Sequence, residues 1–191
     1  MKTIEVRLKK NEEKIIPYIW INGEENHIQV NAVLSEEGAR LIIVGIFFAT
    51  GANSVIFNTK IAHRASHTKS LTAIRGVFLN NSSFNNDGLI NIQKGAKNAD
   101  GYFSSKILLF NDAKGRSVPS LEIDENEVKA GHASTVGRPN EEQLFYLKSR
   151  GLSEKEAEKL IITGFFQPLL GYLTQSEQKN IVSKVEHLIH E

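Results

Sequence analysis

The sequence predicts a mainly β body followed by a small helical domain at the C-terminus. Up to about residue 129 the hydrophobic residues recur mostly with a period of two, as in Ile4, Val6 and Leu8, which is typical of half-buried strands. Glycine and asparagine interrupt this pattern at turn positions. After Pro139 the spacing changes to three and four residues, as in amphipathic helices. We therefore assign residues 1–138 to the β body and residues 139–191 to the helical domain.

The β body is expected to consist of about ten short strands with no helix between them. The predicted strands cover residues 4–9, 14–21, 28–33, 40–49, 54–61, 72–79, 89–93, 104–109, 117–123 and 126–129. Turn-forming pairs such as Asn22-Gly23 and Thr50-Gly51 separate several of them. Strand propensity does not distinguish a sandwich, a barrel and a β-solenoid, and no repeat of fixed length stands out.

Three helices are predicted in the tail because three N-terminal capping boxes follow one another. The boxes pair Asn140 with Gln143, Ser153 with Glu156, and Thr174 with Glu177. The first helix should cover residues 141–150 and end before Gly151, which suits the left-handed conformation that follows many helices. The second should bury one apolar stripe, made of Ala157, Leu160, Ile161, Gly164, Phe165 and Pro168. The third should bury Ile181, Val185 and Leu188. Each stripe must pack on the β body or, in part, on a partner protein.

Composition excludes several classes of function. Lys and Arg number 23 against 22 for Asp and Glu, so no strong charge attracts nucleic acid or anionic membranes. Cysteine is absent, which excludes disulfides, thiolate-bound zinc and a cysteine nucleophile in this chain. The longest apolar stretch, residues 41–50, is far shorter than the roughly 20 residues of a membrane-spanning helix. The N-terminus does not resemble a signal peptide, and a cytoplasmic protein is expected.

Histidines offer two candidate sites. His63 and His67 are four residues apart, but the flanking residues indicate strand and turn, which favours two partly exposed polar histidines over a metal site. His132 lies among small residues that would leave its imidazole accessible, and Glu122 or Asp112 could supply carboxylates for a metal such as ferrous iron. The alternative for His132 is a hydrogen-bonded side chain between the last strand and the first helix.

Two adjacent segments resemble the C-terminal signature of the SufB/SufD family of iron–sulfur cluster assembly proteins. They are VKAGHASTVGR at residues 128–138 and NEEQLFYLKSRG at residues 140–151. Further blocks similar to the family are HRASHT at 63–68, IRGV at 74–77, and VP with LEI within 118–123. The likeness extends at least from residue 63 to about residue 165.

The resemblance implies a right-handed parallel β-helix followed by a short helical domain. In the family, SufB and SufD pair through their β-helix ends, and each binds one copy of the ATPase SufC through its C-terminal helices. A SufB cysteine and a SufD histidine are the proposed cluster ligands, and His132 matches that histidine. The position of the cysteine corresponds approximately to Lys114, whose protonated amine cannot replace a thiolate. The chain is therefore expected to be SufD-like in its chemistry, or to be a family member that has lost direct cluster ligation.

These observations lead to one main hypothesis, a non-enzymatic SufD-like scaffold that binds a SufC-type ATPase. The expected partner-binding residues are Glu142, Gln143, Leu144, Phe145, Tyr146, Arg150, Leu160, Ile161 and Phe165. The isolated chain should hold no cofactor. A cluster is expected only at an interface with a cysteine-bearing partner, with His132 and then Glu122 as candidate ligands. A second SufB/SufD-type chain or another copy should pair with the β body near residues 104–123. The alternatives are a homodimeric binding module without a metal, or a small metal-dependent enzyme using His132.

Overall fold

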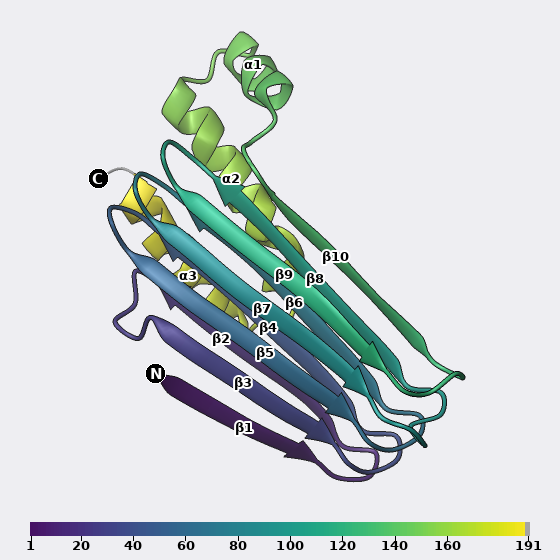
Figure 1. The fold of residues 1–191 in the computed structure, drawn as a ribbon. Coiled ribbons are helices and arrows are strands. Elements are labelled where there is room, and N and C mark those ends of the chain that lie inside the picture. Colours follow the sequence, from purple (N-terminus) through teal and green to yellow (C-terminus); the bar gives the residue numbers. More distant parts are fainter. Residues whose placement is uncertain (190–191) are drawn as a thin grey trace.

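The computed structural model describes residues 1–189 as ten strands followed by three helices (Figure 1). The strands are β1 (Lys2–Leu8), β2 (Glu13–Ile21), β3 (His27–Leu34), β4 (Arg40–Ala49), β5 (Ser54–His63), β6 (Lys69–Phe78), β7 (Ser83–Ile92), β8 (Asp100–Leu109), β9 (Lys114–Ile123) and β10 (Lys129–Gly137). The helices are α1 (Glu141–Ser149), α2 (Glu154–Leu170) and α3 (Gln175–Ile189). No helix within residues 1–189 is long and apolar enough to cross a membrane.

The strands form a parallel β-solenoid of five coils. Odd-numbered strands make one parallel sheet in the order β1-β3-β5-β7-β9, and even-numbered strands make a second in the order β10-β8-β6-β4-β2. Because successive strands alternate between the sheets, each consecutive pair completes one coil (Figure 1). Every inner strand is hydrogen-bonded on both sides, and β1, β2, β9 and β10 are the edges. The predicted β-helix followed by helices is confirmed.

The coils repeat at spacings that the sequence analysis did not find. Arg40, Lys69 and Asp100 are in register on neighbouring strands, 29 and 31 residues apart. At one corner, the first four turns each contain a residue with positive φ, in order Asn11, Gly38, His67 and Asn98, and Gly95 is a second in the last of these turns. At the other corner, the residue with positive φ is in order Asn22, Gly51, Asn80 and Asn111. Asparagine and glycine tolerate this left-handed conformation best, so the recurrence marks the corners of successive coils. His67 is one of these turn residues.

The outer face of the even-numbered sheet carries the helical layer. Residues of β4 and β6, including Val44, Phe48 and Val77, share one buried cluster with α2 and α3. From α3, Ile181 and Val185 are buried as predicted. In contrast, α1 buries no residue, and Figure 1 shows it beyond the strand ends, away from the sheets.

The predicted apolar stripe of α2 is largely wrong. Ala157 is buried, but Leu160, Gly164 and Pro168 are exposed. The buried side chains that pack on the sheet are Ile162, Phe166, Leu169 and Leu170, and of the predicted stripe Phe165 also packs against this cluster, half-buried. Apolar residues surround much of this helix, so spacing alone allows two stripes. Of these two stripes, the one that packs against the sheet has the larger side chains in the middle of the stripe.

Two local expectations also need correction. Ser153 with Glu156 and Thr174 with Glu177 form reciprocal capping boxes, whereas Asn140 caps α1 only by accepting from the backbone N–H groups of residues 142 and 143. Residues 126–128 do not form a strand, and residue 129 instead begins the last strand, β10, at residues 129–137. Its small residues give little strand propensity, and pairing with β8 determines its conformation instead.

His63 is buried inside the solenoid and not partly exposed as expected. The Thr68 hydroxyl donates to the Ala65 carbonyl, so it accepts from His63 Nδ1–H at 2.8 Å. The Ser70 hydroxyl then donates to Nε2, also at 2.8 Å. Burial lowers the pKa of His63 to about 4, although the charge of Asp100 opposes this shift. The imidazole is therefore neutral and fully bonded, which leaves no nitrogen for a metal.

His63 should make the fold sensitive to acid. Its pKa is about 4 when folded, against 6.5 for the ordinary side chain, so the unfolded chain takes up the proton first. The stabilisation is complete above pH 6.5 and is lost as the pH falls towards 4. The free energy of unfolding, measured by urea titration, should be roughly 2–3 kcal/mol lower at about pH 4.5 than at about pH 7 because of this group. The difference should shrink in His63→Gln but persist in His132→Gln, and an equal pH dependence in all three proteins would contradict this assignment.

Candidate functional site

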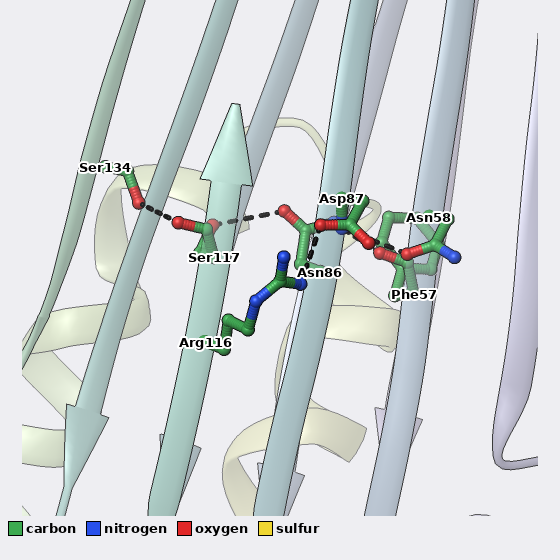
Figure 2. A network of polar contacts seen from close by, with 7 residues as sticks. All are labelled: Phe57, Asn58, Asn86, Asp87, Arg116, Ser117 and Ser134. Carbon is green, nitrogen blue, oxygen red and sulfur yellow. Dashed lines mark hydrogen bonds and ion pairs between the residues drawn. The ribbon is translucent and has the colours of Figure 1, made fainter. Parts of the chain in front are cut away.

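The C-terminal end of the solenoid contains a chain of polar contacts that crosses its interior (Figure 2). The Ser134 hydroxyl on β10 donates to the Ser117 carbonyl on β9 at 3.3 Å. The Ser117 hydroxyl donates to Asn86 Oδ1 on β7 at 3.2 Å, and Asn86 Nδ2 donates to the Phe57 carbonyl on β5. Asn86 is fully buried. These bonds connect the last coil to the two coils below it.

His132 lies at the open end of this last coil. It is in register with Phe103, a buried core residue of β8, and side chains in register on neighbouring strands share a face. His132 therefore lies on the inward-facing side of β10. Its side chain is exposed because β10 is an edge strand. The imidazole is thus presented at the end of the solenoid, accessible to another molecule.

The predicted carboxylates do not join His132. Glu122 lies on the outer face of β9, where it accepts a hydrogen bond of 3.0 Å from Asn91 Nδ2, while its neighbour Leu121 packs against the interior. Asp112 lies in the turn between β8 and β9. Within residues 1–189 no group of three or more His, Cys, Asp or Glu side chains could hold a metal ion. Any cluster at this end would need ligands from another chain.

A second candidate surface is the hollow between α1 and α2, with a volume of about 570 Å³. Its lining residues are Asn140, Glu142, Gln143, Tyr146, Leu147, Leu160 and Ile161. Tyr146 is 56% exposed and Leu160 is 51% exposed. Five of the nine predicted partner-binding residues therefore meet in one exposed, partly apolar hollow.

The other four predicted residues lie outside the lining of this hollow. Phe145 is 74% exposed on α1, and the Arg150 guanidinium lies over the Tyr146 ring at 5.2 Å. Leu144 is half-buried. Phe165 packs with the sheet-side core, where the Arg75 guanidinium lies 4.9 Å from its ring centre. Phe165 therefore contributes to holding α2 on the solenoid.

Comparison with known proteins identifies the family. The family model described as "SUF system FeS cluster assembly, SufBD core domain" matches residues 2–165. The chain belongs to the SufBD family. The match covers the whole solenoid and continues through α1 into α2, so both candidate surfaces lie within the SufBD core domain.

Three curated relatives illustrate the similarity. The "Iron-sulfur cluster assembly protein SufD" of Bacillus subtilis is 34% identical over 152 residues, which are 78% of this chain and 34% of the relative. A SufBD family protein of Mycobacterium leprae is 28% identical over 179 residues, 88% of this chain and 46% of the relative. A SufBD family protein of Staphylococcus epidermidis is 31% identical over 139 residues, which are 72% of this chain and 30% of the relative. The chain therefore spans between about a third and a half of the relatives' length.

Sequence reasoning did not find the interior polar residues of this SufBD core. The register places Asn86 beside Ser117, and Phe57 lies 29 residues before Asn86. The signal that could have revealed them is the coil repeat, because equivalent residues recur every 29 to 31 positions in the central coils. Without that alignment, isolated Asn and Ser residues are indistinguishable from turn residues.

Proposed function

We propose that this chain is a non-enzymatic, SufD-like scaffold subunit in iron–sulfur cluster assembly. Its membership of the SufBD family supports a role in assembly. The absence of cysteine favours a chain that positions partners over one that holds a cluster alone. The observation that carries the proposal is the exposed α1–α2 hollow, which lies in the family-like segment and has no covering element within residues 1–189.

The proposed occupant of the hollow is a SufC-type ATPase. The first helix buries nothing against the solenoid, so the exposed Phe145 and Tyr146 rings are available to a partner. Aromatic side chains of this kind are enriched among the residues that dominate protein–protein binding. The second helix runs from this hollow to the sheet, where Phe166 and Leu169 are buried. A partner bound to α1 and α2 would thus be linked to the solenoid through a packed helix.

The proposed cluster-forming surface is the open end of the solenoid that presents His132. A partner with cysteine thiolates would supply the ligands that this chain lacks. The unpaired edges of β9 and β10 provide backbone groups for contact with a second SufBD-type chain. Within residues 104–123, β8 is paired on both sides, so β9 is the part of that range that offers a free edge.

Co-elution tests the proposal. The chain should be mixed with a purified SufC-type ATPase and separated by size-exclusion chromatography with and without ATP. We expect a common peak in which both proteins are present. Separate elution under both conditions, with each protein folded, would contradict the scaffold proposal.

Self-association is the expected state when no other SufBD-type chain is present. The free strand edges at the solenoid end favour pairing. Light scattering at micromolar concentration should give twice the chain mass of 21.3 kDa. A monomer at all concentrations would remove the proposed pairing.

A further inference from the structure

The helical layer leaves part of the even-numbered sheet uncovered. One uncovered row crosses four strands in register: Ile15, Ile42, Leu71 and Tyr102. We call it the apolar row. Ile15 is 44% exposed and Tyr102 is 43% exposed. Ile42 and Leu71 are half-buried and pack against the cluster under α2 and α3. The apolar row therefore continues the surface on which the helices already lie.

A row of charges borders the apolar row. Two positions earlier on the same strands lie Glu13, Arg40, Lys69 and Asp100, again in register. Within residues 1–189 none of the four forms a salt bridge. Across the sheet the charges read negative, positive, positive, negative. A hollow of about 300 Å³ lies between the two rows, lined by members of both.

We propose that these two rows bind an amphipathic helix of a partner protein, laid across the strands. Two neighbouring acidic residues of that helix would face Arg40 and Lys69. A basic residue at each end would face Glu13 and Asp100. Its apolar side chains would pack between Ile15 and Tyr102.

The dimensions of a helix match this pattern. Neighbouring strands are about 4.8 Å apart, close to the roughly 5–6 Å between helix residues three or four apart. The charge row spans three such intervals, about 14 Å, which corresponds to about ten helical residues. Both rows run across the strands, so an added helix would extend the existing layer of α2 and α3.

The charges disfavour a second copy of this chain on the same face. In a two-fold pair whose axis runs along the strands at the centre of the row, so that both rows overlap fully, Arg40 would face Lys69 and Glu13 would face Asp100. With the axis across the strands, each residue would face the same residue of the second copy. Like charges meet in both arrangements, which opposes association.

Two synthetic peptides of about 15 residues provide the probes, because shorter isolated helices are unstable in water. One carries a leucine stripe bordered by Lys, Glu, Glu and Lys one turn apart, and the other carries the same stripe with Glu, Lys, Lys and Glu. Fluorescence anisotropy should show about tenfold tighter binding of the first at low salt. Tyr102→Ser should weaken both peptides, and its side chain is exposed enough for the fold to be retained.

The protein variant Arg40→Glu with Lys69→Glu should remove the preference, because the row then carries four negative charges and each peptide meets two of them with lysine and two with glutamate. Equal affinity of the wild-type chain for the two peptides, no binding of either, or an unchanged preference in this variant would overturn the proposal. If the wild-type chain self-associates and the variant does not, the surface is an interface between copies and the helix proposal fails.

Discussion

Replacement of Leu160 by aspartate is expected to abolish binding of the SufC-type ATPase. Leu160 is 51% exposed at the α1–α2 hollow, so the change should alter the free energy of unfolding by less than about 0.5 kcal/mol. In a complex, however, it would bury an unpaired carboxylate among apolar groups. Truncating a central contact of this kind costs about 2 kcal/mol or more, and titration calorimetry should show a loss of at least roughly thirtyfold in affinity.

Two further variants make that result interpretable. Tyr172→Asp also places a charge at an exposed hydrophobic position of the helical domain, but outside the hollow, and it should bind the ATPase normally. Phe165→Asp is a poor probe because Phe165 packs with the sheet-side core, so it should lower stability. Undiminished binding by a folded Leu160→Asp variant would show that the hollow is not the docking surface.

Reconstitution of a cluster should fail on the isolated chain and succeed with a SufB-type partner. The chain has no thiolate, and residues 1–189 contain no cluster of three or more potential metal ligands. A single accessible imidazole cannot retain cluster iron, which is held chiefly by several thiolates. After anaerobic incubation with iron and sulfide and desalting, the chain alone should be colourless. With the partner present, visible charge-transfer absorption should appear.

The contribution of His132 can be separated from that of the partner. In the complex, His132→Ala should lower the cluster yield while the assembly keeps its size. His67→Asn is the matched control, because it removes another exposed histidine and places at that corner the residue type found at Asn98. A stable cluster on the isolated chain would contradict the first expectation. Equal yields from the two histidine variants would contradict the second.

Much of the architecture could be predicted from the sequence. The period-two pattern predicted the strands, and three successive N-terminal caps predicted the helices that follow them. Backbone pairing and capping both depend on local residue type. The solenoid itself rested on the resemblance of segments such as residues 128–138 to the family. The coil repeat stayed hidden because only turn residues such as Asn80 and Asn111 recur, while different apolar side chains fill equivalent interior positions.

The site was predicted less completely, for reasons of packing. Five of the predicted docking residues share the hollow, but Phe165 packs with the core on the sheet side. The face that an all-round apolar helix buries depends on the sheet it meets, and spacing does not contain that information. Similarly, His63 lies inside and Glu122 outside the solenoid because of strand register. A shift of one position along a strand moves a side chain from the inner face of the sheet to the outer face.

Native mass spectrometry of three proteins mixed together tests the central claim most directly. The mixture contains this chain, a SufC-type ATPase and a cysteine-bearing SufB-type chain. If the chain is a scaffold, a species containing all three should form, and Leu160→Asp should lower its mass by one copy of the ATPase while the SufB-type chain, with its own copy, stays bound. If no species contains this chain together with either partner, the scaffold account is contradicted.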